Sequence, residues 1–344
     1  MTGKVRWGVL GAAHIAVKKV IPAMQRGEWC EIAAIGSRDL AKAQQAAAAL
    51  GIPKAYGSYE ELLADREIEA VYNPLPNHLH VPWSVRAAEA GKHVLCEKPL
   101  ALSVVEVDAI EAAARRSGRH VLEAFMYRHA PRWRRAVELV RSGAIGAPRV
   151  VRIGFAFSVP TDLANIRFVS EAGGGIVWDM GCYATSMARG LLGWEPTELF
   201  AFADVREGQP TETTVTGVMR FPHHVTAPFW VSFDFGNPFA QVEVVGSEGW
   251  MLLPGTGMRR EPFTRLLLHR GATEVYEDGA EPAVETFPFV DPYRLEVEHL
   301  AGAIRGRAPL ELTLADARAN TAVLVAMHAS IESRTPWRVA HVVG

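Results

Sequence analysis

Two short motifs carry side chains suited to moving a proton. Glu97-Lys98-Pro99 places a lysine between an acid and a proline at the end of an apolar run, and Asp179 and Tyr183 stand four residues apart in a glycine-rich stretch. Residues at that spacing share one face of a helix. A phenol with a pKa near ~10 serves as an acid or base at neutral pH when a nearby cation favours its ionised form. We therefore expect Tyr183 to act as the acid/base and Lys98 as its electrostatic partner, with Asp179 orienting the lysine or binding a hydroxyl.

These assignments have open alternatives. The roles of Lys98 and Tyr183 can be exchanged, because an ammonium also carries a proton. Alternatively, Asp179 and Tyr183 only cap and pack a helix, and Lys98 only binds a ribose.

A sequence motif typical of dinucleotide binding lies near the N-terminus. The run Gly11-Ala12-Ala13-His14-Ile15-Ala16 follows an apolar stretch and precedes a helical pattern, which is the context that the dinucleotide-binding turn requires. Alanine replaces the central glycine, but it is small enough for the backbone to approach a pyrophosphate at a helix start. The alternative is a close-packed turn that holds no ligand.

The end of the next strand indicates which dinucleotide is bound. An NAD site places an acid about 20 residues after the fingerprint, where it holds the ribose hydroxyls. Here Gly36 is followed by Ser37 and Arg38, with Lys42 one helical turn further on. A hydroxyl and a planar guanidinium suit a 2′-phosphate, so the pattern favours NADP. The alternative is an exposed arginine in a strand-to-helix link.

Residues 1–125 alternate between short apolar runs and helical stretches. Runs that are apolar throughout are typical of parallel strands covered on both faces, so we expect a doubly wound parallel sheet. The expected strands are Val5–Leu10, Glu31–Ile35, Ala70–Tyr72, His93–Cys96 and His120–Glu123, and the expected helices are Ile15–Arg26, Leu40–Leu50, Val81–Ala90 and Val104–Arg116.

Residues 126–344 change to strands without intervening helices, which predicts an α+β domain with a large, open, mostly antiparallel sheet. The expected strands are Arg149–Phe157, Glu198–Val205, Thr213–Phe221, Val225–Asp234, Gln241–Val245, Trp250–Leu253, Leu266–His269 and Thr273–Tyr276, and the expected helices are Trp133–Arg141, Asp179–Leu192, Pro292–Arg305 and Leu314–Ser333. The apolar series Phe229, Val231 and Phe233 is expected to face a partner subunit in a homodimer or homotetramer.

Composition excludes several classes of protein. Among the 344 residues, 36 Lys and Arg nearly balance 38 Asp and Glu, so no overall field attracts nucleic acid or anionic lipid. No apolar run approaches the roughly 18 residues that span a bilayer. Three scattered cysteines indicate neither a disulfide framework nor a metal site. We expect a cytoplasmic protein with no nucleic-acid, membrane or metal partner.

Taken in order, these motifs resemble the Gfo/Idh/MocA oxidoreductases, within which the chain is most similar to the NADP-dependent D-xylose and trans-dihydrobenzenediol dehydrogenases. The resemblance runs from Val5 to about Arg338. The segment Glu123–Arg128 is a further motif that carries it. It implies a Rossmann domain, a second domain that carries substrate and oligomer contacts, and hydride transfer to or from a sugar, polyol or cyclic diol.

The resemblance also implies roles for further residues. It matches Lys98 and Asp179 to the active-site lysine and acid of the family, and Tyr183 to a position that is histidine in inositol-type members. It places cofactor contacts at Arg167 and along Pro74-Leu75-Pro76-Asn77-His78 and Glu97-Lys98, and substrate contacts at Lys98, Arg167, Asp179, Tyr183 and Tyr293, to which the strand pattern adds Phe157. Surface charge or ordinary packing is the alternative for Arg167, Tyr293 and Phe157.

Two alternatives to a freely exchanging dehydrogenase remain at this point. One is a regulatory protein that senses NADP or sugar without catalysis. The other is an aldose-aldose oxidoreductase that keeps its NADP tightly bound while it converts one sugar and then another.

Overall fold

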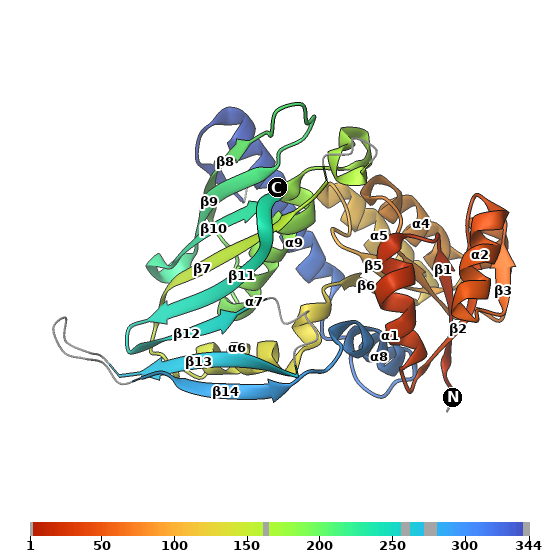
Figure 1. Ribbon diagram of the computed structural model, residues 1–344, viewed down its shortest axis with the longest axis horizontal. Coiled ribbons are helices and arrows are strands. Elements are labelled where there is room, and N and C mark those ends of the chain that lie inside the picture. The colour runs from red at the N-terminus through yellow and green to blue at the C-terminus, as the bar shows by residue number, and fades with distance from the viewer. Residues whose placement is uncertain (1–2, 161–164, 256–261, 272–280, 340–344) are drawn as a thin grey trace. The chain divides into compact units, whose positions relative to one another are not determined.

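The computed structural model (Figure 1) describes residues 3–160, 165–255, 262–271 and 281–339. They form two compact units, residues 1–129 with 290–318 (unit 1) and residues 130–289 with 319–344 (unit 2). The sequence analysis expected one domain to end at residue 125 and the other to run from 126 to 344. Unit 1 also includes residues 290–318, because helix α8 (Pro292–Ile304) contacts β2, β5 and α1 of unit 1. Its Val297, Leu300 and Ala301 lie in the hydrophobic core of that unit.

Unit 1 is built on a six-stranded sheet in the order β3-β2-β1-β4-β5-β6, with its neighbouring strands parallel. This order is that of a Rossmann fold, as the sequence predicted. In chain order its elements are β1 (Val5–Leu10), η1 (Ala16–Val20), α1 (Ile21–Gln25), β2 (Cys30–Gly36), α2 (Leu40–Leu50), β3 (Lys54–Tyr56), α3 (Tyr59–Ala64), β4 (Ala70–Asn73), α4 (Asn77–Glu89), β5 (His93–Glu97), α5 (Val104–Ser117), β6 (Val121–Ala124), η2 (Met126–His129) and α8.

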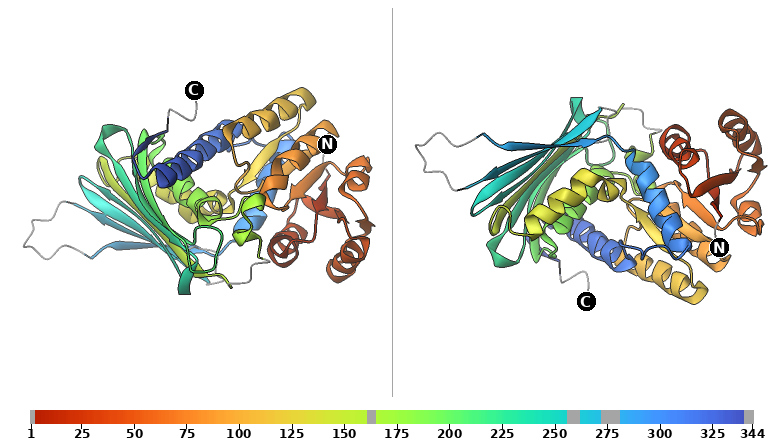
Figure 2. Two further views of the ribbon diagram at one scale, coloured as in Figure 1. Left: turned by 90° about the horizontal axis from the view of Figure 1, so that it is seen from above. Right: turned by 90° about the horizontal axis from the view of Figure 1, so that it is seen from below.

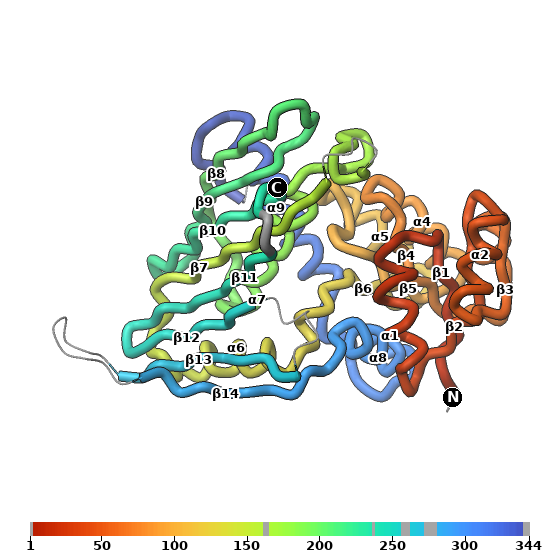
Figure 3. The backbone as a smooth tube through the Cα atoms, in the orientation of Figure 1, coloured from red at the N-terminus to blue at the C-terminus, as the bar shows by residue number. Residues whose placement is uncertain are grey.

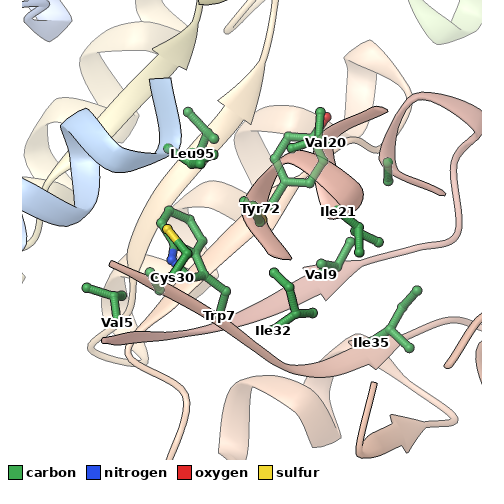
Figure 4. Close-up of a cluster of buried hydrophobic side chains, with 14 of the residues drawn as sticks. Val5, Trp7, Val9, Val20, Ile21, Cys30, Ile32, Ile35, Tyr72 and Leu95 are labelled. Atoms are coloured by element: carbon green, nitrogen blue, oxygen red, sulfur yellow. The ribbon is translucent and has the colours of Figure 1, made fainter. Parts of the chain in front are cut away.

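The central strands of unit 1 are apolar because both faces of the sheet are covered. Figure 4 shows one of these faces, where Val5, Trp7 and Val9 of β1 lie with Ile32 of β2 and Tyr72 of β4. Burying side chains of this size contributes about 1.5–3 kcal/mol each. The sheet is therefore a rigid support for the turns at its carboxyl edge.

Unit 2 is built on a nine-stranded sheet in the order β14-β13-β12-β11-β7-β10-β9-β8-β15. Within this sheet, only β10 and β7 pair in parallel among the described strands, so the expected mostly antiparallel sheet is confirmed. The path of its long strands is clearest in Figure 3. Its elements are α6 (Pro131–Arg141), β7 (Pro148–Ser158), η3 (Ile166–Phe168), η4 (Ser170–Ala172), η5 (Val177–Gly181), α7 (Cys182–Leu192), β8 (Glu198–Asp204), β9 (Thr214–Arg220), η6 (Pro222–His224), β10 (Thr226–Ser232), β11 (Asp234–Gly246), β12 (Gly249–Pro254), β13 (Phe263–Arg270), β14 (Ala283–Pro288), most of α9 (Leu314–Ser333) and β15 (Trp337–Arg338). The strand expected at Thr273–Tyr276 lies outside the described residues.

Helices cover one face of the nine-stranded sheet, as Figure 2 shows for α6, α7 and α9. Phe229, Val231 and Phe233 are at most 1% exposed within this one chain, so the expectation that they face a partner subunit was wrong. Strand alternation turns their neighbours outward instead. In the part of the chain that the structure describes, no helix has the length and apolar character needed to cross a membrane.

Candidate functional site

The fingerprint turn lies at the carboxyl end of β1, at the point where the strand order of the sheet reverses. Gly11 has φ +93°, and its N–H donates to the Gly36 carbonyl at 2.6 Å. A Cβ at this position would lie 3.1 Å from the Leu75 side chain and 3.6 Å from the Tyr59 hydroxyl. Only glycine adopts this conformation without strain. Glycine at this position thus allows the tight turn and its close packing against Leu75 and Tyr59.

A helix begins directly after this turn. Its first closed hydrogen bond runs from the Val17 N–H to the Ala13 carbonyl at 3.0 Å, so the preceding amides, including those of His14 and Ile15, have no acceptor within the helix. Ala12 and His14 are exposed. Amides at the start of a helix attract anions, and a pyrophosphate is the anion that the fingerprint predicts here.

Arg38 follows β2 and is exposed. Its guanidinium faces the phenol of Tyr59, where it lowers the pKa of a hydroxyl whose burial raises it. The Ser37 hydroxyl accepts from Asp39 N–H at 3.2 Å, and Lys42 Nζ lies 3.8 Å from the Asp39 carboxylate. Lys42 therefore serves a local ion pair, whereas Arg38 and Tyr59 stand beside the fingerprint turn. The sequence reading missed Tyr59.

The predicted cofactor loop Pro74-Leu75-Pro76 follows β4 and leads into α4, which begins at Asn77 and His78. Asn73 fixes this loop with its side chain. The carboxamide oxygen accepts from Leu75 N–H at 3.3 Å, and the amide nitrogen donates to the His80 carbonyl at 3.1 Å. The loop is thus held at the same edge of the sheet as Gly11.

Glu97 and Lys98 end the neighbouring strand β5 and are half-buried. The Tyr72 hydroxyl donates to Glu97 Oε1 at 2.6 Å, and burial together with the Glu97 charge raises the pKa of Tyr72 well above its usual value. Leu100 N–H donates to Glu123 Oε1 at 2.9 Å, which fixes the backbone after Pro99. Lys98 therefore stands on a backbone that is held on both sides.

Helix α8 brings two further acidic groups to this edge. Glu296 is 1% exposed, and its Oε1 has no hydrogen-bond partner among the described residues. Burial and the charge of Glu97 raise its pKa well above the usual value, because both disfavour the charged carboxylate. Tyr293, predicted to contact substrate, packs against the hydrophobic core of unit 1, and burial and Glu97 raise its pKa. The sequence reading missed Glu296, although an acid on the inward face of an amphipathic helix was a usable signal.

Four of the predicted substrate residues, Phe157, Arg167, Asp179 and Tyr183, belong to unit 2, whereas Lys98 and Tyr293 belong to unit 1. Arg167 Nε donates to Asp179 Oδ2 at 2.7 Å, and the guanidinium lies 6.0 Å from the ring centroid of Phe157. Tyr183 stands in the first turn of α7 and is 9% exposed. The Arg167 side chain is 38% exposed and that of Asp179 is 16% exposed, so this corner presents a charged pair beside an aromatic ring.

The glycine-rich stretch sets where the Asp179 helix begins. Gly175 has φ +103°, and a Cβ there would overlap the Glu212 carboxylate. Glu212 accepts from Val177 N–H at 3.2 Å, and burial raises its pKa. Asp179 then lies in the π-helical turn η5, a feature frequent at functional sites. Glu212 is a third residue that the sequence analysis missed, after Tyr59 and Glu296.

The described residues include one group whose atoms would suit a metal ion. Ligand atoms of His129, His299 and Glu311 lie within 4.8 Å of one another. However, Glu311 N–H donates to His299 Nε2 at 3.1 Å and occupies that lone pair. We assign no metal to this group.

The known proteins that this chain is similar to are oxidoreductases. Residues 5–125 match the family described as "Oxidoreductase family, NAD-binding Rossmann fold", and residues 133–252 match the GFO/IDH/MocA C-terminal domain. An uncharacterized oxidoreductase of Rhizobium meliloti is 40% identical, covering 97% of this chain and 98% of that protein. A D-xylose 1-dehydrogenase (NADP+) of Haloferax volcanii is 41% identical, covering 88% and 90%. The crystal structure of an aldose-aldose oxidoreductase from Caulobacter crescentus, complexed with glycerol, has a TM-score of 0.87 and 25% identity, covering 97% and 99%.

Proposed function

Since the chain belongs to the GFO/IDH/MocA oxidoreductases with an NAD-binding Rossmann fold, we propose that it is an NADP(H)-dependent dehydrogenase or reductase of sugars, polyols or cyclic diols. When bound, the nicotinamide supplies or accepts the hydride. The observation that carries the proposal is Arg38, which stands beside the fingerprint turn where an NAD site has an acid. The xylose dehydrogenase relative, whose name specifies NADP+, supports the same cofactor.

The residues of unit 1 fit this cofactor. Gly11 permits the tight turn, and the first amides of the following helix would donate to the pyrophosphate. Arg38, with Ser37, would bind the 2′-phosphate through charge-assisted hydrogen bonds. The loop Pro74–His78 and Glu97 would hold the ribose of the nicotinamide half, and Lys98 would act on the reacting group.

The residues of unit 2 bind the sugar and exchange its proton. Arg167 and Asp179 hold hydroxyl groups, and Phe157 covers an apolar face of the ring. Tyr183 takes the hydroxyl proton during oxidation and returns it during reduction, and Lys98 is the second group that we assign to proton transfer. Exchange of these two roles is the alternative within the same proposal.

An absorbance assay at the nicotinamide band tests the proposal. NADP and NAD are supplied with D-xylose, other aldoses, inositols and cyclic diols, and Lys98→Met and Tyr183→Phe are measured beside the wild type. Each variant is expected to lower kcat/KM by about 100-fold or more. Normal kcat/KM in both variants would remove the proton-transfer assignment, and cofactor binding without turnover of any substrate would favour a sensor.

A second candidate is a sugar-to-sugar oxidoreductase that retains its NADP. The likeness to the aldose-aldose oxidoreductase favours it. Absorbance and mass spectrometry of gel-filtered protein distinguish the two candidates, because a retained dinucleotide supports the second and a protein that needs added NADP supports the first.

We also propose that the outer face of the nine-stranded sheet joins two copies of the chain in a dimer or tetramer. On this face the Trp230 ring stacks on Phe239, with ring centroids 5.2 Å apart, and lies tilted against Phe235 at 5.3 Å, and Phe202 is 59% exposed. Exposed apolar residues grouped in this way mark interfaces. Light scattering is expected to give a mass above that of the monomer, which Phe202→Lys lowers and the exposed-site control Val105→Lys does not. A monomeric wild type contradicts this proposal.

We further place the protein in the cytoplasm. Cys30, Cys96 and Cys182 are buried free thiols, as suits a reducing compartment. Cell fractionation tests this assignment.

A further inference from the structure

His80 is a buried polar residue to which the proposed mechanism gives no role. It lies in the first turns of α4 and is 1% exposed. Both of its ring nitrogens contact carbonyl oxygens. Nδ1 lies 2.7 Å from the Pro99 carbonyl, and Nε2 lies 2.7 Å from the Leu75 carbonyl.

The two carbonyls belong to the two turns that matter most at the carboxyl edge of unit 1. Leu75 lies in the loop after β4, and Pro99 follows Lys98 after β5. These strands are parallel neighbours, paired from Ala70 with His93 to Asn73 with Cys96. The imidazole of His80 therefore contacts both turns just beyond the last pair of that ladder.

Burial lowers the pKa of His80 to about 4, and the nearby Lys98 ammonium acts in the same direction. The ring is thus neutral at neutral pH and has one N–H to donate. That single donor goes to either Leu75 or Pro99 according to the tautomer. Because the ring is packed between both carbonyls, a shorter or differently shaped side chain changes their separation.

We propose that His80 is a positioning residue that holds the Leu75 loop and the Lys98-Pro99 turn at a fixed separation and so sets the place of Lys98. The backbone around Lys98 is already held by Tyr72 through Glu97 and by Glu123 through Leu100. His80 adds contacts to the Pro99 carbonyl, directly after Lys98, and to the Leu75 carbonyl of the cofactor loop. The catalytic part of this inference rests on the proposed function.

The kinetic test compares His80→Asn and His80→Gln with a matched control, His93→Asn. His93 is also buried and lies at the opposite end of β5. Active sites are counted by NADPH fluorescence titration. Both His80 variants are expected to lose about 10- to 100-fold in kcat per titrated site, because a misplacement near 1 Å costs that much. KM for the sugar changes little, because unit 2 binds the sugar. The control keeps its kcat per site.

Hydrogen–deuterium exchange of the full chain supplies a readout that needs no turnover. Peptides containing the Leu75 and Leu100 amides are expected to exchange faster in both His80 variants and at the wild-type rate in His93→Asn. Unchanged exchange at these amides overturns the inference, as does unchanged kcat per site in an active enzyme. If the wild type turns over no substrate with NADP(H), the proposed function fails, and exchange alone decides whether His80 connects the two turns.

Discussion

Replacing Glu296 by glutamine is expected to make the protein more stable near neutral pH. The carboxyl is 1% exposed, lacks a partner for Oε1 among the described residues and faces the charge of Glu97. These causes raise its folded pKa well above the unfolded value, so the folded state holds a proton that the unfolded state releases as pH rises. The stabilising contribution is complete below the unfolded pKa of about 4.3 and falls by about 1.4 kcal/mol per pH unit until the folded pKa is reached. Glutamine is neutral throughout and nearly the same size, so Glu296→Gln does not lose this contribution.

Urea unfolding at several pH values between 5 and 8 measures the effect. The free energy of unfolding of Glu296→Gln is expected to exceed that of the wild type by about 1 kcal/mol at pH 5, which is already above the unfolded pKa, and by more as pH rises toward the folded pKa. Glu69→Gln is the control of opposite sign, because Glu69 pairs with Arg305 at 2.8 Å and its pKa is lowered. Its contribution is present above the unfolded pKa and is lost on acidification, so its glutamine variant is the less stable one at neutral pH. Parallel curves for Glu296→Gln and the wild type would refute the reasoning that an uncompensated carboxyl is buried there.

Three further changes probe the two units. Arg38→Ala should raise the Kd for NADPH about 10- to 100-fold and leave that for NADH unchanged, because a charge-assisted hydrogen bond is worth roughly 1.5–3 kcal/mol; equal loss for both dinucleotides in fluorescence titrations argues against the phosphate contact. Gly175→Ala should lower the free energy of unfolding by about 1–3 kcal/mol, because its φ of +103° and the Glu212 carboxylate both oppose a Cβ; an unchanged melting temperature contradicts this. Arg167→Met should raise KM for the sugar by about 10-fold or more, because it removes the partner 2.7 Å from Asp179; steady-state kinetics with unchanged KM would exclude Arg167 from the substrate site.

Local pattern was enough to predict most elements of both units. Val5–Leu10, Leu40–Leu50 and Leu314–Ser333 occur with the predicted bounds. Strand β3 was missed because Lys54–Tyr56 is a short, half-buried edge segment with no apolar run to mark it. The outer face of the nine-stranded sheet was misassigned because alternation separates the two faces of a strand without saying which face the helices cover.

Some residues of the candidate site could be predicted from local sequence, and others could not because their partners lie far away in the sequence. Turn and strand-end motifs determine Gly11, Arg38, Lys98 and Asp179, because a turn conformation and its exposed neighbours depend on a few consecutive residues. The groups that surround them come from remote segments: Tyr59 beside Arg38, Glu296 beside Glu97, and Glu212 below Gly175. Their contacts arise only when packing brings distant helices and strands together. The sequence by itself therefore determined which side chains could take part in binding and proton transfer. The tertiary structure decided which buried neighbours shift their pKa values and fix their positions.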